Sequence, residues 1–187
     1  MQNHFDKPEK TVLAEGKYLR VISYDGWEWV ERINCTGIVV IAALTKNREI
    51  LFVEQYRKPI RANVIELPAG LVGDSEQHKN ESLETAAIRE LLEETGYRAE
   101  KLIFLTEGPP SAGLATEVIT FFGALSVERI GIGEGDGTEE ITLHTVPLED
   151  AENWLEQKRI ASVLIDPKVY IGLYFLAKLI ESAGAKS

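Results

Sequence analysis

The sequence contains almost no cysteine and no long apolar run. Cys35 is the single cysteine among 187 residues, so no internal disulfide can form, which is typical of proteins from a reducing cytoplasm. No apolar stretch approaches the ~20 residues that a membrane span needs. The N-terminal MQNHFDKPEK also lacks the apolar segment of a signal peptide. We therefore expect a cytoplasmic protein that does not associate with membranes.

Basic residues are scarce relative to acidic ones. The chain carries 20 Lys and Arg against 30 Asp and Glu, a formal net charge of −10, which argues against a nucleic-acid partner. A small phosphorylated substrate is not excluded, since divalent cations can lie between carboxylates and phosphates. Glutamates are dense between Glu76 and Glu100, whereas His4, His78 and His144 lie at no metal-ligand spacing. The local acidity is therefore the first indication of a metal site.

The remaining composition is that of one globular domain, with 44% hydrophobic and 27% charged residues. Strands, one helix, further strands and two closing helices favour an α+β layered domain over a βαβ series. Pro68, Ala69 and Gly70 should end the strand before the first helix, and the polar loop 73–80 should be exposed, without a catalytic role. The predicted strands are 11–33 (two or three), 36–44, 50–56, 64–67, 100–106, 117–126 and 140–146, and the predicted helices run from Asn80 or Ser82 to Gly96 and over 148–157 and 167–182.

The stretch ESLETAAIRELLEETGY predicts a helix with an acidic edge. At about 100° per residue, Glu90, Glu93 and Glu94 share one side, while Leu91 falls on the opposite, apolar side. Like charges at this spacing oppose each other, so helix stability alone does not explain them. Clustered carboxylates suit Mg²⁺ or Mn²⁺, and Arg89 is placed to hold one of them in position. The alternative interpretation is a solvated acidic helix face.

Arg89–Tyr97 (RELLEETGY) resembles the second half of the Nudix box, GX5EX7REUXEEXGU, where U is a bulky apolar residue. Glu81 stands at the required spacing before this segment. Ten residues instead of five separate Gly70 from Glu81, which indicates a five-residue insertion within 73–80. Glu76 has the correct spacing from Gly70 and is the other candidate for the first box glutamate; the spacing to the second half favours Glu81.

By this resemblance the chain is identified as a member of the Nudix hydrolase superfamily. The resemblance implies the Nudix fold, an α/β/α sandwich with a central mixed β-sheet and an N-terminal antiparallel strand region. It implies Mg²⁺ as the cofactor, with Mn²⁺ as a possible substitute. The implied metal ligands are Glu90, Glu94 and the backbone carbonyl of Ala69, with Glu93 and Arg89 as further catalytic residues.

Other segments resemble the branch that acts on ADP-ribose and other nucleoside diphosphate sugars. The ELPAG segment that starts at Glu66 is one of them and makes Glu66 a candidate for substrate binding. The arginine of QYR, Arg57, matches a residue that contacts the diphosphate. Tyr18, Trp27 and Arg32 match the part that holds the nucleotide, where aromatic faces sandwich adenine. The alternatives are core or dimer contacts for Trp27 and ordinary surface positions for the two arginines.

Two loops complete the predicted site. The segment SAGLATE resembles an SPGxxxE-like loop of the same branch, with alanine in place of proline, and makes Ser111, Gly113 and Glu117 candidates for substrate binding. A glycine-rich stretch before the last predicted strand resembles the mobile loop that supplies the general base. Glu139 and Glu140 both fit that role.

The predicted function is Mg²⁺-dependent hydrolysis of the pyrophosphate bond of ADP-ribose and related nucleoside diphosphate sugars. We expect one domain, 1–187, in which residues 1–35 serve nucleotide binding and homodimer formation and residues 36–187 form the catalytic core. The partners expected are a small nucleotide sugar and a second copy of the chain. The alternatives are a Nudix pyrophosphatase for a triphosphate or a dinucleotide polyphosphate, and a non-catalytic ADP-ribose sensor.

Overall fold

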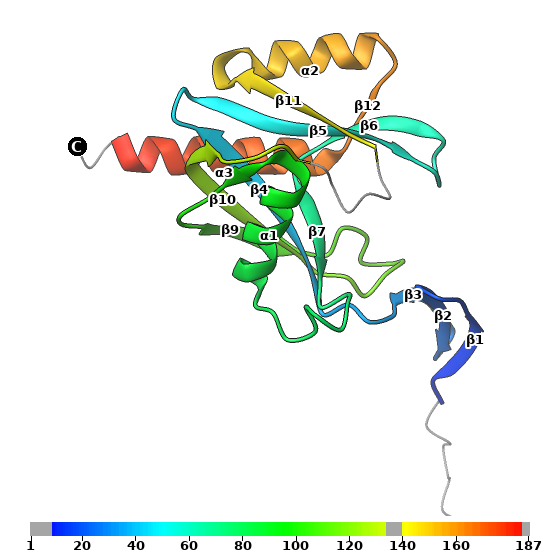
Figure 1. Cartoon of the computed structure of the whole chain (residues 1–187). Helices are drawn as coiled ribbons and strands as arrows, with labels where there is room; N and C mark the ends of the chain where they lie inside the picture. Colours follow the sequence, from blue (N-terminus) through cyan, green and yellow to red (C-terminus); the bar gives the residue numbers. More distant parts are fainter. Residues whose placement is uncertain (1–8, 134–139, 185–187) are drawn as a thin grey trace, which may run out of the picture.

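The computed structural model describes residues 9–133 and 140–184, and its main body is a nine-stranded mixed sheet between helices (Figure 1). The strand order is β12-β6-β5-β4-β10-β8, with β11 on β5, β7 on β4 and β9 on β10. β10 pairs with β4, and β12 with β6, in parallel. The elements are β1 Thr11–Glu15, β2 Leu19–Tyr24, β3 Trp27–Arg32, β4 Gly37–Thr45, β5 Glu49–Arg57, β6 Ala62–Glu66, β7 Ala69–Val72, α1 Leu83–Thr95, β8 Tyr97–Arg98, β9 Ile103–Gly108, β10 Ile119–Arg129, β11 Ile141–Pro147, η1 Leu148–Asp150, α2 Ala151–Ile160, β12 Leu164–Ile165 and α3 Pro167–Gly184.

β4 carries the core on both of its faces. Alternate residues of this strand belong to two buried clusters, one shared with α2 and α3 and the other with α1. The members are Val40, Ala42 and Leu44 in the first cluster and Val39, Ile41 and Ala43 in the second. A strand buried on both faces needs the nearly continuous apolar run of this segment, and each large side chain contributes about 1.5–3 kcal/mol. The predicted α+β sandwich is confirmed.

α1 begins and ends at well-defined caps. The Ser82 side chain accepts a hydrogen bond from the Thr85 amide at 3.2 Å, so Ser82 rather than Asn80 is the N-cap. Gly96 follows the helix in the left-handed region at φ 73° and donates its N–H to the Leu92 carbonyl at 2.8 Å. Leu91 is fully buried and anchors the helix to the sheet. These caps fix where the acidic edge of α1 lies along the sheet.

The predicted end of the strand before α1 is confirmed, since β6 ends at Glu66, but Ala69 and Gly70 were not expected to begin another strand. Both residues belong to β7, which pairs antiparallel with β4. Pro68 has no N–H and interrupts the ladder, but its carbonyl accepts from the Ile41 amide at 2.8 Å. The chain therefore stays against β4 and continues as β7 toward the acidic edge of α1.

Other element boundaries differ by a few residues from those predicted. The last sheet strand before α2 is followed by the short 3-10 turn η1, so α2 starts at Ala151 rather than near residue 148. The two-residue strands β8 and β12 were not predicted, because segments this short carry no periodicity. No helix in the described ranges has both the length and the apolar character required to cross a membrane.

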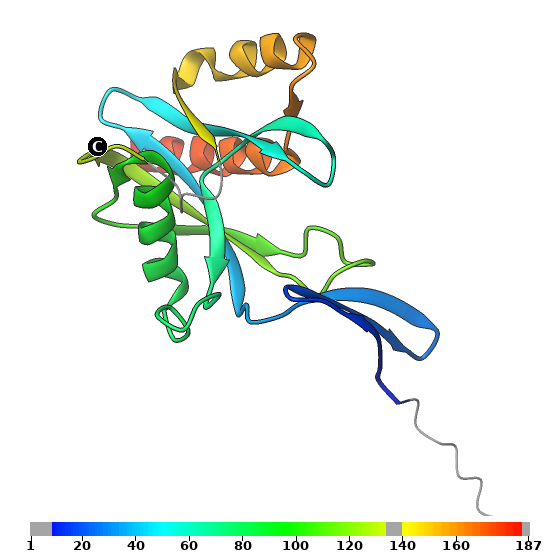
Figure 2. The same cartoon turned by 45° about the vertical axis from the view of Figure 1, so that its right-hand side comes forward.

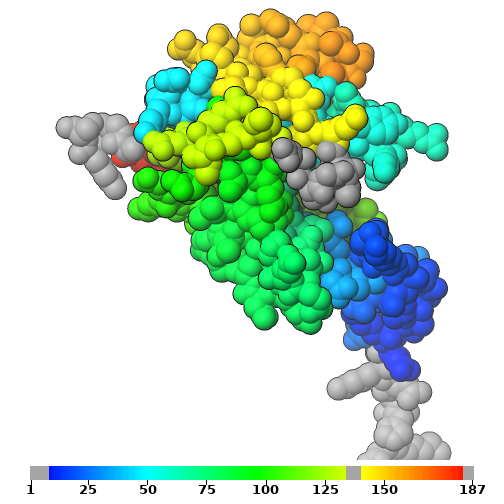
Figure 3. Space-filling model, in the orientation of Figure 1, coloured from blue at the N-terminus to red at the C-terminus, as the bar shows by residue number. Residues whose placement is uncertain are grey.

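β1, β2 and β3 form a separate antiparallel sheet that projects from the main body (Figures 2 and 3). Asp25 and Gly26 join β2 to β3 with φ values of 48° and 78°, the positive values that a tight hairpin turn of this kind requires. Several large apolar side chains of this N-terminal sheet are exposed: Val12, Leu13, Leu19, Tyr24 and Trp27. The sheet therefore has little core of its own.

Candidate catalytic cleft

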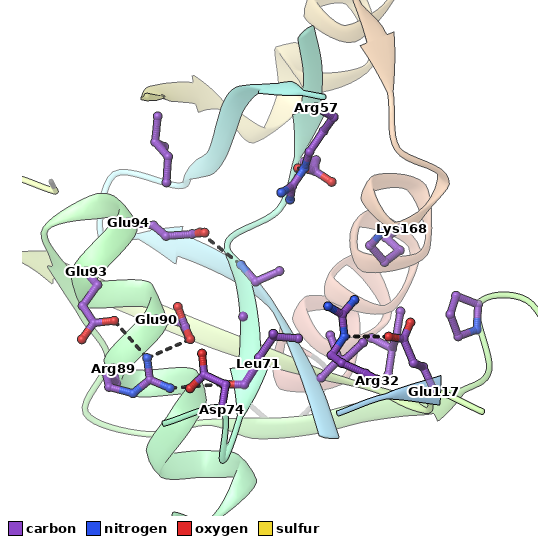
Figure 4. Close-up of a pocket in the computed structure, with 17 residues that line it drawn as sticks. Arg32, Arg57, Leu71, Asp74, Arg89, Glu90, Glu93, Glu94, Glu117 and Lys168 are labelled. Carbon is purple, nitrogen blue, oxygen red and sulfur yellow. Dashed lines mark hydrogen bonds and ion pairs between the residues drawn. The ribbon is translucent and has the colours of Figure 1, made fainter. Parts of the chain in front are cut away.

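A cleft of about 540 Å³ opens between the acidic edge of α1 and the ends of several strands (Figure 4). β7 forms its floor beside α1, and residues of β3, β4, β5, β6, β10, β11, α3 and the adjoining loops complete the wall. The lining residues are Arg32, Ile38, Arg57, Glu66, Ala69, Gly70, Leu71, Asp74, Arg89, Glu90, Glu93, Glu94, Pro110, Glu117, Ile119, Ile141 and Lys168. Most of the site residues predicted from the sequence therefore lie in one cleft.

Arg89 uses all of its N–H groups to organise the glutamate side of the cleft. Its Nε and Nη2 donate to the two oxygens of Glu81 at 3.2 and 2.7 Å. Nη1 donates to Glu90 at 2.8 Å and to Glu93 at 2.9 Å, and Nη2 also donates to the Leu71 carbonyl at 3.2 Å. One guanidinium thereby links the first box glutamate, the acidic edge and β7.

Glu81, rather than Glu76, occupies the position that pairs with Arg89. The hydrogen bonds from Arg89 lower the pKa of Glu81, and its side chain is only 6% exposed. Glu76 lies in the exposed loop with a side chain that is 90% exposed. The spacing argument that favoured Glu81 is consistent with these contacts.

The acidic edge of α1 faces the cleft and not open solvent. The Glu90 side chain is 14% exposed and Glu94 is buried, while Glu93 is 42% exposed. Burial raises the pKa of Glu90 to about 7, although Arg89 opposes the shift, and the charges of Glu93 and Asp74 add to it. The alternative of a solvated acidic face does not fit this burial.

Gly70 lets the backbone of β7 approach Glu90. A β-carbon at residue 70 would lie 1.9 Å from Cδ of Glu90, a distance that no side chain could occupy without displacing that carboxylate. Beside it, the Ala69 amide donates to Oε2 of Glu94 at 3.1 Å. The recorded contact of Ala69 with the acidic edge is thus made by its N–H, whereas the sequence predicted a role for its carbonyl. β7 and α1 are therefore locked together at the carboxylates.

The opposite side of the cleft carries the cationic side chains of Arg57, Arg32 and Lys168 (Figure 4). Each of them is paired with an acidic residue. Arg57 contacts Oε2 of Glu66 through Nε at 2.8 Å and Nη2 at 2.6 Å. Burial raises the pKa of Glu66, and the charge of Arg57 opposes that shift. Arg32 of β3 contacts Glu117 at 2.8 Å. The cleft therefore has the acidic edge of α1 on one side and, on the other, two arginines that are each paired with a glutamate.

Sequence reasoning missed two charged residues of the cleft lining. Lys168, in the first turn of α3, pairs with Asp166 and reaches the cleft. A lysine is unfavourable near a helix N-terminus, and this was the signal that could have identified it. Asp74 also lines the cleft, so the loop 73–80, which was expected to be exposed and without a catalytic role, reaches the cleft with its first acidic residue.

Some predicted residues lie elsewhere. Tyr18 and Trp27 are on the N-terminal sheet, 63% and 66% exposed, and do not line the cleft. Ser111, Gly113 and Glu140 are also absent from its lining, and Glu139 lies outside the described residues. Glu140 nevertheless directly precedes Ile141, which does line the cleft. His144 bonds Glu54 at 2.9 Å in a structural contact.

The fold and the arginine-linked glutamates define the class of protein. Residues 35–165 match the family described as NUDIX domain, and the chain belongs to this family. The ADP-ribose pyrophosphatase of Bacillus subtilis is 35% identical over 134 residues, 70% of this chain and 68% of the relative. The methanol dehydrogenase activator of Bacillus methanolicus is 33% identical over 147 residues, 78% of this chain and 75% of the relative. A solved structure described as an ADP compounds hydrolase shares the fold, with a TM-score of 0.72 at 19% identity over 98% of this chain and 99% of that chain.

Proposed function

We propose that the protein hydrolyses the pyrophosphate bond of ADP-ribose and related nucleoside diphosphate sugars, releasing a nucleoside monophosphate and a sugar phosphate. The observation that carries this proposal is the division of the cleft into a carboxylate side on α1 and a side with Arg32, Arg57 and Lys168. A bound diphosphate needs positive charge on both of its sides. Here the arginine and lysine side chains supply it on one side and a bound metal ion supplies it on the other. The ADP-ribose pyrophosphatase relative supports this substrate class.

The glutamate side fits Mg²⁺, with Mn²⁺ as a substitute. Glu90, Glu94 and the Ala69 carbonyl would hold the ion, with Glu93 beside them, because hard divalent cations prefer oxygen ligands. Among the described residues, no group of three or more acidic, histidine or cysteine side chains is already arranged to hold a metal ion. However, Arg89 contacts only Oε1 of Glu90, and in the described ranges nothing donates to Oε2. When bound, the ion would polarise the diphosphate and offset the charge that develops on it.

The side chains of the cleft divide the remaining work. Arg57 and Arg32 bind the diphosphate, while Arg89 fixes the orientation of Glu90. Glu139 or Glu140 removes a proton from the attacking water, and the position of Glu140 next to the cleft-lining Ile141 supports this assignment. Water attack on phosphorus needs no covalent enzyme intermediate.

The N-terminal sheet serves the nucleotide and a homodimer in this proposal. Tyr18 and Trp27 stack on the base, and their exposure supports a site that a second copy of the chain completes. Ser111 and Gly113 also bind substrate in this proposal, and the hydrogen bond from the Val30 amide of β3 to the neighbouring Leu114 carbonyl supports their place beside the N-terminal sheet. We also propose a cytoplasmic location, for which the lone thiol of Cys35 is the support.

The test is a substrate panel with purified protein. ADP-ribose, other nucleoside diphosphate sugars, nucleoside triphosphates and dinucleotide polyphosphates are incubated with Mg²⁺ or Mn²⁺, and products are identified by chromatography. We expect AMP and ribose 5-phosphate from ADP-ribose, and much lower turnover of triphosphates. Preferential triphosphate hydrolysis would overturn the substrate class, and ADP-ribose binding without any hydrolysis would indicate the sensor alternative.

A further inference from the structure

β3 of the N-terminal sheet meets the main body along the segment that leads into β10. The Val30 amide donates to the Leu114 carbonyl at 2.8 Å, and Val30 forms a parallel bridge with Ala115. Val30 and Ala115 are 85 residues apart in the sequence, and so are Arg32 and Glu117, which stand two residues further along each segment. Arg32 and Glu117 therefore follow the same register. The ion pair between them is thus the side-chain continuation of a backbone contact.

Arg32 differs from the other cleft arginines in how its donors are used. Among the described residues its hydrogen-bond partner is Glu117, which accepts from Nε at 2.8 Å. All N–H groups of Arg89 donate hydrogen bonds within the protein, and both Nε and Nη2 of Arg57 contact Glu66. Figure 4 shows the Arg32 guanidinium directed into the cleft beside Glu117. Its two terminal nitrogens form a fork that suits phosphate oxygens.

We propose that Glu117 is a positioning residue that holds Nε of Arg32, so that Nη1 and Nη2 face the substrate diphosphate. This inference rests on the proposed function and revises the expectation that Glu117 itself contacts substrate. Both side chains are partly buried, 31% exposed for Arg32 and 22% for Glu117, so the pair is less screened than a surface ion pair. Because Glu117 already fixes the guanidinium before substrate binds, less side-chain conformational entropy is lost on binding. Glu117 thereby also ties the N-terminal sheet to diphosphate recognition.

The test compares Arg32→Ala, Glu117→Ala, Glu117→Gln and the Arg32→Ala/Glu117→Ala double variant. We expect Arg32→Ala and Glu117→Ala each to raise KM for ADP-ribose roughly 10- to 100-fold, with kcat nearly unchanged. The double variant should resemble Arg32→Ala alone, because Glu117 acts through Arg32. Glu117→Gln should recover most of the affinity, since an amide oxygen can still accept from Nε. Arg20→Ala is the matched control: its pair with Glu31 at 2.7 Å lies in the same sheet but away from the cleft lining.

A second readout does not depend on turnover. The Kd of inorganic pyrophosphate, measured by calorimetry in EDTA, should rise for Glu117→Ala and recover for Glu117→Gln. If the wild-type protein cleaves no nucleotide sugar, the proposed function fails, while this measurement still decides the role of Glu117. Multiplicative effects in the double variant, a fall in kcat, or unchanged pyrophosphate affinity in Glu117→Ala would overturn the positioning role.

Discussion

Gly70 and Glu90 are in such close contact that a β-carbon on residue 70 would lie 1.9 Å from Cδ of the glutamate. We expect Gly70→Ala to displace the Glu90 carboxylate and to lower kcat/KM at least tenfold. The fold should survive, because the displaced atoms are the end of a side chain. Steady-state assays with a thermal melt measure both effects.

Gly108→Ala is the control for that experiment. A β-carbon there meets no atom within 4 Å, and the residue has no positive φ that would strain alanine. Its activity should match the wild type. Equal activity of the two variants would show that the approach of β7 to Glu90 is not needed for catalysis.

Glu94→Gln tests the metal assignment. The change keeps the size of the side chain and its bond from the Ala69 amide but removes a negative ligand. Turnover should fall roughly 10³-fold, because loss of several kcal/mol of transition-state stabilisation is typical when a metal ligand is lost. Glu84→Gln, an exposed change on the same helix, should leave activity unchanged. Near wild-type turnover of Glu94→Gln at saturating Mg²⁺ would rule Glu94 out as a ligand.

The identity of the first box glutamate can be tested through stability. Glu81→Gln should lower the Tm by several degrees at pH 7, because the glutamate accepts two charge-assisted bonds from Arg89, worth about 1.5–3 kcal/mol each. Glu76→Gln should change nothing.

The pH dependence of the Glu81→Gln effect has a defined sign. The pKa of Glu81 is lowered in the folded state, so its contribution is complete above the ordinary glutamate pKa of about 4.3 and is lost as pH falls through the lowered value. The Tm difference between wild type and variant should therefore shrink in acid. A difference that stays constant down to pH 3 contradicts the proposed ion pair.

Glu139→Gln and Glu140→Gln separate the general base from the metal ligands. The base acts only in the chemical step, so its loss should lower kcat strongly while the affinities for substrate and metal stay nearly the same. Higher pH should partly restore the rate, since hydroxide needs no base. Full kcat in both variants would place the base elsewhere, with Glu93 the next residue to test.

The acidic edge of α1 could be predicted because it depends on local geometry alone. Helical periodicity brings Glu90 and Glu94 together, and caps of the kind seen at Ser82 and Gly96 have recognisable residue types. Glu81 could be identified in spite of the insertion in the loop 73–80, because the residues between Glu81 and Arg89 belong to α1 and its N-terminal cap.

The rest of the site depends on contacts between distant segments. The chain stays beside β4 after Pro68 and enters β7 because the Pro68 carbonyl accepts a hydrogen bond from the Ile41 amide. No local sequence pattern reveals this contact. Tyr18 and Trp27 lie outside the cleft of a single chain because of where the N-terminal sheet contacts the main body. That contact joins residues 85 positions apart in the sequence, such as Arg32 and Glu117. Sequence similarity indicated the residue types but not this placement.

The parallel pairing of β4 with β10 has a consequence for the speed of folding. Ile38 lies opposite Ile119, so the entire stretch that contains β7 and α1 must be looped out before this ladder can form. Closing such a long loop costs conformational entropy before any contact repays it, which is typical of slow-folding topologies. Arg32 precedes this looped-out stretch in the sequence and Ile119 follows it, and both line the cleft together with Glu90. During refolding the protein should therefore regain helix signal well before it regains the ability to bind pyrophosphate.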